Sequence, residues 1–270
     1  RRGMITIKSQ REIEIMRRSG KITAKTLAML MKAAKPGVTT GELDRLAEES
    51  IRSMGGVPTF IGYHGYPSSI CASVNEEVVH GMPGDRVLQN GDLLSIDIGT
   101  TLEGYVSDSA ITVPIGEVSA AAKRLMKVTQ ECLMLGIAEM TVGKHVGDIG
   151  YAVQRHAESN GYGVVRALVG HGVGRKMHED PQVPNYGSPG EGAALRAGLV
   201  LAVEPMITQG TWEVETLDDG WTVVTEDGKL AAHFEHTIAV TDQGPKILTL
   251  RDVGEHEDAA RYRPAGDLAA

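Results

Sequence analysis

Four carboxylates occupy two pairs of matching positions in this sequence. The segment 91–97 (GDLLSID) matches 198–204 (GLVLAVE) in the second half of the chain, and 108–113 (DSAITV) matches 235–240 (EHTIAV). The acids in these segments are Asp97, Asp108, Glu204 and Glu235. A fold with pseudo-twofold symmetry would bring all four together, and four buried carboxylates cannot remain together without cations.

One imidazole is the natural further ligand of such a cluster. His171 ends a predicted apolar strand between Gly170 and Gly172, which would let a metal approach closely, although a lone histidine can equally be structural. Two divalent ions would neutralise the formal charge of −4 on the four carboxylates, whereas one ion would leave −2. Oxygen ligands with one histidine suit Mn²⁺, Fe²⁺, Co²⁺ or Zn²⁺. Two such ions ~3.5–4 Å apart would hold a bridging water, lower its pKa and stabilise an oxyanion, which predicts a hydrolase.

Other motifs limit the chemistry. A single acid at a strand end is usually solvated, so the prediction rests on the aligned pairs. His80 and His178 each precede turn residues, and from the pattern alone each either caps a loop or belongs to the site. His178 lacks the second histidine of an H-E-x-x-H motif, and the chain has neither a complete G-x-G-x-x-G nor a G-x-S-x-G motif. Zincin, dinucleotide-binding and serine-hydrolase chemistry are therefore not expected.

Composition predicts an ordinary soluble globular protein. The chain has 270 residues, of which 41% are hydrophobic and 23% charged, and its net charge is −8. It has no apolar run near the ~18 residues of a membrane span, no signal-peptide stretch at its start and no long basic run. Cys71 and Cys132 lack the spacing of a zinc site or a disulfide scaffold. We therefore expect a cytoplasmic protein without a membrane segment or a nucleic-acid-specific site. We also expect it to be a monomer.

Helix pairs followed by mainly antiparallel strands occur twice along the chain. The capping boxes Ser9-x-x-Glu12 and Thr39-x-x-Glu42 begin two helices, which end near residue 32 and at Gly55. The other predicted elements are strands at 69–75, 93–100 and 105–113, helices at 120–139 and 148–159, and strands at 164–170, 199–207, 221–225, 230–240 and 246–250. This order predicts an α+β fold, with helices on one face of a curved sheet and a site on the other.

The same pattern predicts the domain organisation. A single catalytic domain, 1–250, would consist of half-domains at about 10–115 and 120–250. Residues 251–270 have little apolar content and are predicted to form a disordered C-terminal tail.

Several short motifs resemble one family of metallopeptidases. They are 63–67 (YHGYP), 79–83 (VHGMP), 170–174 (GHGVG), 177–181 (MHEDP) and 203–206 (VEPM). In order and setting they resemble the short bacterial form of the type I methionine aminopeptidases over about residues 10–250. The resemblance implies the pita-bread fold and a centre of two divalent metal ions. It also implies five metal ligands, namely Asp97, Asp108, His171, Glu204 and Glu235.

The resemblance further implies removal of the initiator methionine from nascent polypeptides, with a small second residue preferred. A metal-bridging hydroxide would attack the scissile carbonyl while Glu204 shuttles a proton to the leaving amine. His178 would bond the carbonyl oxygen, and His80 would contact the amide nitrogen. The residues expected around the methionine side chain are Tyr63, Tyr66, Cys71, Trp221, Phe60 and Met177. The last two depart from the family's commoner cysteine and phenylalanine, so the shape of the pocket is expected to differ.

Two alternatives remain open at this point. An aminopeptidase or dipeptidase that cuts Xaa-Pro bonds would use a similar five-ligand centre, but that branch normally carries an extra N-terminal domain, and here the first helix begins near residue 9. A non-catalytic binding protein on the same fold would have lost ligands, whereas all five are present here. The partners that the resemblance implies are polypeptide N-termini beginning with methionine, and the ribosome.

Overall fold

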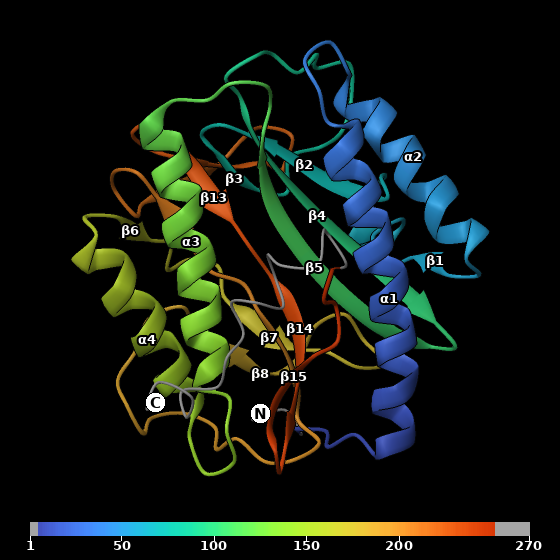
Figure 1. Cartoon of the computed structure of the whole chain (residues 1–270), viewed down its shortest axis with the longest axis vertical. Helices are drawn as coiled ribbons and strands as arrows, with labels where there is room; N and C mark the ends of the chain where they lie inside the picture. Colours follow the sequence, from blue (N-terminus) through green and yellow to red (C-terminus); the bar gives the residue numbers. More distant parts are fainter. Residues whose placement is uncertain (1–4, 252–270) are drawn as a thin grey trace, which may run out of the picture.

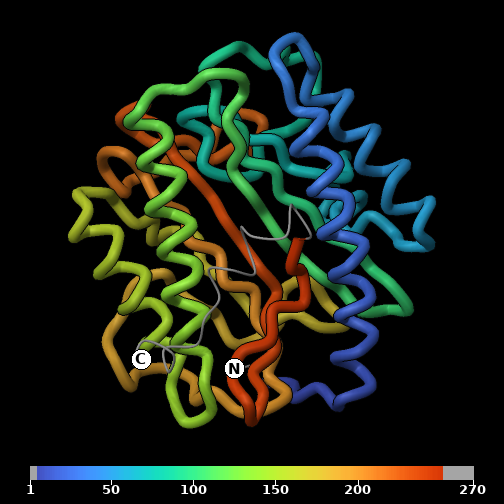
Figure 2. Tube along the Cα trace, viewed as in Figure 1, coloured from blue at the N-terminus to red at the C-terminus, as the bar shows by residue number. Residues whose placement is uncertain are grey.

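Two helix pairs cover one side of a set of antiparallel sheets in the computed structural model, which describes residues 5–251 (Figure 1). The first pair is α1 (Gln10–Ala33) with α2 (Thr40–Ser53), and the second is α3 (Ala120–Ala138) with α4 (Val146–Ser159). Figure 2 traces both pairs along the same face of the molecule. From residue 252 onward, the predicted tail lies outside the described residues. Within 5–251, no helix has both the length and the hydropathy needed to cross a bilayer.

The first helix pair begins where side chains replace the missing hydrogen bonds of a first turn. The Ser9 side chain accepts a bond from the backbone N–H of Glu12, and the Glu12 carboxylate accepts one from the Ser9 backbone N–H at 2.8 Å. Thr39 and Glu42 form the same reciprocal box at the start of α2. Both predicted helix starts are therefore confirmed, and each is explained by local chemistry.

All strand pairs within the described residues are antiparallel, and they form four sheets. In the first sheet, β4 (Leu93–Leu102) pairs with β5 (Tyr105–Pro114), β2 (Ile70–Val74) and β1 (Val57–Pro58). The second has the order β15 (Gly244–Ile247), β14 (His236–Thr241), β9 (Val200–Val203), β7 (Gly170–Gly172) and β8 (Glu179–Val183). The two smaller sheets are β13 (Ala231–His233), β10 (Met206–Thr208) and β6 (Gly163–Val164), and β11 (Val214–Thr216), β12 (Val223–Thr225) and β3 (Glu77–Val79).

The repeat in the sequence corresponds to a repeat in the structure. Helices α2 and α4 occupy matching places and have the same length, and each is followed by a strand of the same short length, β1 after α2 and β6 after α4. Strand β1 pairs with the end of β4 as β6 pairs with β10, with Thr101 and Thr208 as the matching partners. The predicted α+β fold with two similar halves is confirmed.

Strand breaks distinguish the second half from the first. The strand predicted at 199–207 is divided into β9 and β10 by Glu204 and Pro205, because proline has no N–H to offer a ladder. The strand predicted at 230–240 is likewise divided, into β13 and β14, by Phe234 and Glu235. Residues 164–170 also form parts of two strands, β6 and β7, in place of one. Two of these breaks therefore fall at Glu204 and Glu235, which are two of the four acids at matching positions in the sequence.

Side-chain hydroxyls join the two halves of the molecule. Glu235 forms an isolated backbone bridge with Ala110 of β5, and Ser109 Oγ donates to the Glu235 carbonyl at 2.7 Å. Thr237 Oγ1 accepts from the backbone N–H of Asp108 at 2.9 Å and donates to the Asp108 carbonyl at 2.8 Å. This hydroxyl seam comprises Ser109, Thr112 and Thr237 with their partners Glu235, His233 and Asp108. It holds Asp108 of the first half beside Glu235 of the second.

One apolar cluster runs through both halves behind the seam. It includes Leu27 and Leu30 of α1, Ile96 and Ile98 of β4, Leu133 and Ile137 of α3, and Leu201 and Val203 of β9, all at most 1% exposed. Burying side chains of this size stabilises a fold by about 1.5–3 kcal/mol each relative to exposure. The helices therefore fix the strands from one side, and the polar ends of the strands face the other.

Gly20 gives a test of how α1 packs. A Cβ at this position would overlap the backbone carbonyl oxygen of Leu248, in the segment that follows β15. We expect Gly20→Ala to lower the free energy of unfolding by about 1–3 kcal/mol, although alanine normally stabilises a helix interior relative to glycine by ~1 kcal/mol. Urea denaturation followed by far-UV circular dichroism measures this change.

Gly136→Ala in α3 is the matched control. Its Cβ would meet side-chain carbons of Val153 and Ile149, at 3.0 and 3.3 Å, and side chains can move where a backbone carbonyl cannot. We expect a smaller loss of stability for this variant. Equal losses, or a gain for Gly20→Ala, would contradict the packing argument.

Candidate active site

A cavity of about 260 Å³ opens where the two halves meet. All of the site residues predicted from the sequence line it, and so does His64. His64 belongs to the YHGYP motif but is not among the site residues that the sequence predicts. Its ring packs edge-on against Tyr63 with centroids 4.4 Å apart, and its backbone is left-handed with φ 49°. The only signal for it in the sequence was its place between two predicted pocket residues.

The ladder register of β4 and β5 brings the first two acids to one face. Asp97 lies opposite Ala110, and Asp108 lies opposite Gly99, so the acids occupy neighbouring positions on the same side of the hairpin. Gly99 carries no side chain, and the ring of Phe60 fills that space: a Cβ at Gly99 would meet Phe60 Cε1 at 2.8 Å. The hairpin therefore presents two carboxylates with an aromatic ring packed beside them.

The second half supplies two more acids and an imidazole. Glu204 stands at the break after β9, and Asn185 Nδ2 donates to its backbone carbonyl at 3.0 Å. His171 lies on β7, with Nδ1 2.8 Å from the carbonyl of Gly172. Because Nδ1 donates to that carbonyl, Nε2 presents its lone pair to the cavity, 3.4 Å from Glu204 Oε1 and 3.8 Å from Asp108 Oδ2.

Burial and like charge dominate the electrostatics of these groups. Desolvation is the largest cause that raises the pKa of Asp97 and of Glu235 well above the usual range, and neighbouring carboxylates raise both further. Desolvation, followed by the charge of Asp108, raises the pKa of Glu204 in the same way. The pKa of Asp108 is raised to about 7 by desolvation. Burial also lowers the pKa of His171 to about 3, so this imidazole is neutral.

The donor atoms fit divalent cations. Three buried carboxylate oxygens have no hydrogen-bond partner within the described residues: Asp97 Oδ1, Asp108 Oδ1 and Glu235 Oε1. Ligand atoms of Asp108, His171 and Glu235 lie within 4.8 Å of one another, and so do those of Glu204, His233 and Glu235. Leaving such oxygens buried and unpaired is costly, and cations would remove that cost. His233 was not among the residues predicted from the sequence.

Two further histidines flank the acids. His178 Nδ1 lies 2.6 Å from the hydroxyl of Tyr63, and its ring packs edge-on against His171 with centroids 4.3 Å apart. Burial lowers the pKa of His178 and of His80, and in each case a second histidine lowers it further. His80 has left-handed backbone geometry with φ 60°. Both imidazoles are therefore neutral and face the cavity.

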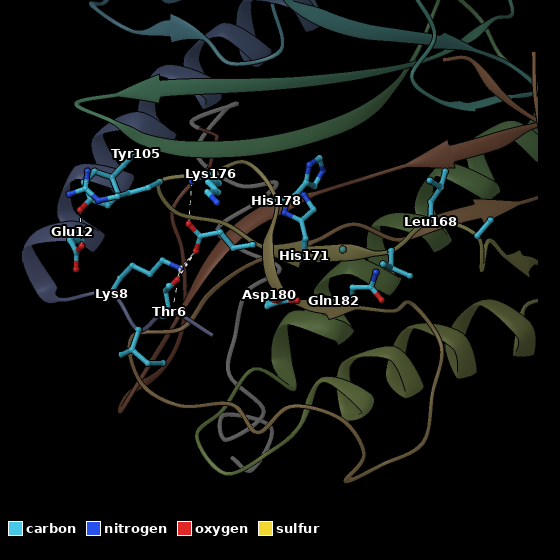
Figure 3. Close-up of a pocket in the computed structure, with 16 residues that line it drawn as sticks. Thr6, Lys8, Glu12, Tyr105, Leu168, His171, Lys176, His178, Asp180 and Gln182 are labelled. Atoms are coloured by element: carbon cyan, nitrogen blue, oxygen red, sulfur yellow. Dashed lines mark hydrogen bonds and ion pairs between the residues drawn. The ribbon is translucent and has the colours of Figure 1, made fainter. Parts of the chain in front are cut away.

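An ion pair behind the cavity fixes the turn that carries His178. Glu179 Oε2 lies 2.7 Å from Lys8 Nζ and accepts from Thr6 Oγ1 at 2.6 Å, while Glu179 Oε1 accepts from the backbone of Lys176 at 3.2 Å. These contacts are the dashed lines around Lys8, Thr6 and Lys176 in Figure 3, which shows a second cavity of about 990 Å³ on this side of His171 and His178. The N-terminal segment thus supports the histidine turn from outside.

Part of the wall of the smaller cavity is uncharged. Tyr66 packs edge-on against Trp221 with centroids 5.0 Å apart and donates its hydroxyl to the Ile70 carbonyl at 2.8 Å. Cys71 is 5% exposed and Met177 is 7% exposed. Burial raises the pKa of the Cys71 thiol well above its usual range, so this wall is uncharged. An apolar pocket beside a cluster of acids suits a side chain without charge.

The two tryptophans of the second half, Trp212 and Trp221, lie in different surroundings. Trp221 lines the cavity, but Trp212 lies under the guanidinium of Arg166, 4.9 Å from Cζ to the ring centroid. Strand β12, which follows Trp221, pairs with β3 of the first half and so brings only this tryptophan to the site.

Known proteins agree with this architecture. The profile of metallopeptidase family M24 matches residues 14–242, and the chain belongs to that family. It is 55% identical to a methionine aminopeptidase of Clostridium acetobutylicum, over 92% of this chain and 99% of that protein, and 52% identical to methionine aminopeptidase 1 of Bacillus subtilis, over 91% and 99%. It is thus a hydrolase of the methionine aminopeptidase branch.

Solved structures agree as well. The methionine aminopeptidase of Thermotoga maritima superposes with a TM-score of 0.90 at 46% identity, over 91% of this chain and 99% of that one. An Xaa-Pro dipeptidase of Bacillus anthracis superposes with a TM-score of 0.74 at 22% identity and is covered only to 61% of its length, which supports the fold alone. The predicted pita-bread fold and the resemblance to the short bacterial enzymes are confirmed.

The clustered acids predict an unusual pH dependence of the metal-free protein. Asp108 has a pKa near 7 in the native state but ionises near pH 4 when unfolded, so between these values the native state holds the additional proton. Its contribution to stability is therefore complete below about pH 4 and is lost as the pH rises toward 7. Between about pH 4 and pH 7, the free energy of unfolding of the EDTA-treated protein should fall by at most about 4 kcal/mol relative to that of the Asp108→Asn variant.

Urea unfolding of both proteins at half-unit pH intervals measures this difference. Excess Mn²⁺ should reverse the trend in the unsubstituted protein, because ions stabilise the ionised carboxylates. A stability difference that stays flat with pH, or that grows in favour of the unsubstituted protein, would contradict the described burial of Asp108.

Proposed function

We propose that this chain removes the N-terminal methionine from peptides and nascent proteins by metal-dependent hydrolysis. The observation that supports this most is that one cavity is lined both by clustered acids with neutral imidazoles and by uncharged aromatic and sulfur-containing side chains. The names of the relatives agree with this substrate. A small second residue is proposed to be preferred, as the resemblance to the methionine aminopeptidases implies.

Two divalent ions are proposed to bind among the acids of this cavity. Their ligands would be Asp97, Asp108, His171, Glu204 and Glu235, and two ions would balance the formal charge of the four acids. When bound, such ions supply Lewis acidity at the scissile carbonyl and lower the pKa of the attacking water. The mixed oxygen and imidazole donor set suits Mn²⁺, Fe²⁺, Co²⁺ or Zn²⁺.

Glu204 is proposed to move the proton. Its carboxylate lines the cavity, and the break at Pro205 directs it away from the regular ladder. It would accept a proton from the attacking water and deliver it to the nitrogen of the departing amine, acting first as general base and then as general acid. As the amide C–N bond breaks, the water contributes its hydroxyl to the new methionine carboxylate and its proton to the amine.

The two flanking histidines are proposed to orient the scissile amide. If the Tyr63 hydroxyl donates to His178 Nδ1, then Nε2 carries the proton and can donate to the carbonyl oxygen as negative charge develops there. His80 would contact the amide nitrogen from the other side. The free amine of the substrate would lie near Asp97, which restricts cleavage to chain ends.

The uncharged wall is proposed to select methionine. Tyr63, Tyr66, Cys71 and Trp221 would surround the thioether, with Phe60 and Met177 beside them. An unbranched, polarisable side chain adapts to such a pocket and makes favourable sulfur–aromatic contacts of about 0.3–1.5 kcal/mol. We further propose that the halves act as one catalytic domain, in a cytoplasmic monomer that meets nascent chains at the ribosome.

A substrate comparison tests the proposed function. With Mn²⁺ or Co²⁺, the protein should release methionine from Met-Ala-Ser and should cut Xaa-Pro peptides at least 100-fold more slowly, as kcat/KM measured by liquid chromatography. Glu204→Gln should remove the activity while leaving far-UV circular dichroism unchanged. Preference for Xaa-Pro peptides would favour the related dipeptidases, and metal binding without any hydrolysis would favour a non-catalytic binding protein.

His178→Ala tests the role of that imidazole. We expect kcat for Met-Ala-Ser to fall by about 10²–10³, because a donor to the developing oxyanion is lost, while KM changes little. Calorimetric titration with Mn²⁺ should give the same affinity as for the unsubstituted protein, since His178 is not among the proposed ligands. A loss of metal affinity as large as the loss of kcat would contradict this role.

A further inference from the structure

His233 approaches the acid cluster from behind the cavity. It is the last residue of β13, it is 1% exposed, and it is not among the residues that line the described cavity. The hydroxyl seam clamps its backbone, since Thr112 Oγ1 accepts from its N–H at 2.8 Å and donates to its carbonyl at 2.9 Å. These bonds fix the backbone of His233, and its side chain extends from there toward the acids.

The imidazole of His233 is buried without a hydrogen-bond partner. Neither ring nitrogen has one within the described residues. Nε2 lies 3.7 Å from Glu204 Oε2 and 4.0 Å from Glu235 Oε2. A neutral imidazole has one N–H donor, and leaving it unpaired in the interior costs about 1–3 kcal/mol. The nearest acceptors that could remove this cost are these two carboxylates.

Glu204 stands between two imidazoles. His171 Nε2 faces one of its oxygens, Oε1, at 3.4 Å, and His233 Nε2 faces the other, Oε2, at 3.7 Å. If Oε1 is the oxygen turned toward an ion, then Oε2 is the oxygen that can accept a hydrogen bond from His233. The present separation exceeds the usual N–H···O distance of ~3.0 Å by about 0.7 Å, which a small rotation of the glutamate would close.

We propose that His233 is a positioning residue of the metal centre, whose Nε2–H donates to Glu204 Oε2 and holds that carboxylate for both metal binding and proton transfer. The inference rests on the proposed function and adds to it a residue outside the five ligands. Hydrogen bonds to ligating carboxylates typically contribute 10–100-fold to metal affinity. Loss of the donor should therefore lower the affinity for the ion and also misplace Glu204 for proton transfer.

Two substitutions separate this role from the alternatives. His233→Gln keeps an N–H donor at similar reach, whereas His233→Leu removes the donor at similar volume. We expect the leucine variant to bind Mn²⁺ about 10–100-fold more weakly in calorimetric titration of EDTA-treated protein, and to lose kcat. The glutamine variant should stay within about threefold of the unsubstituted protein, with the same visible absorption spectrum when loaded with Co²⁺.

Three results would overturn the inference. If the leucine variant binds Mn²⁺ as tightly as the unsubstituted protein, His233 does not support the centre. If the glutamine variant is as weak as the leucine variant and its Co²⁺ spectrum changes, His233 is a direct ligand. If the unsubstituted protein binds no divalent ion, the proposed function fails and the inference fails with it, whereas the first two results overturn the inference and leave the proposed function intact.

A neighbouring buried histidine provides the matched control. His236 is 2% exposed and its Nδ1 lies 2.9 Å from Thr249 Oγ1, so its partner is not one of the acids. His236→Leu should lower the stability of the fold but leave the affinity for Mn²⁺ unchanged. Should His233→Leu fail to fold, His233→Asn replaces it, because the shorter amide withdraws the donor while it keeps the polarity.

Discussion

Repulsion among four clustered carboxylates, two of them buried and two partly buried, is the constraint on which the rest of this structure depends. Desolvation and mutual charge raise the pKa of these acids, and several of their oxygens have no partner within residues 5–251. In the absence of bound cations, such a cluster can persist in a folded protein only if other contacts hold the acids together. The apolar core behind the strands and the hydroxyl seam between the halves supply that restraint.

Much of this arrangement is predictable because it is encoded locally and then repeated. The capping boxes at Ser9 and Thr39 begin helices by contacts within four residues, and the repeat transfers the same order of elements to the second half. Asp97 and Asp108 come to one face because a short turn fixes the register of β4 and β5. Once two halves with acids at matching positions are expected, convergence of the acids follows from symmetry.

The rest of the site depends on contacts between residues far apart in sequence. His233 stands near Glu204 because it lies opposite Met206 in the pairing of β13 with β10, and because Thr112 binds its backbone across the seam. No spacing in the sequence reveals either contact. The division of the second-half strands at Pro205 and Glu235 is a departure from the repeat, so symmetry predicted continuous strands there. Trp212 looked equivalent to Trp221 in composition, but pairing of β12 with β3 brought only Trp221 to the cavity.

The seam also bears on the order in which the protein is made. Its partners lie far apart along the chain, at Ser109 and Thr112 in the first half and at Glu235 and His233 in the second. A chain emerging from synthesis therefore carries Asp97 and Asp108 for a long interval before their counterparts exist. Because the seam closes only when β14 is in place, all four carboxylates come together only after the second half of the chain has been made.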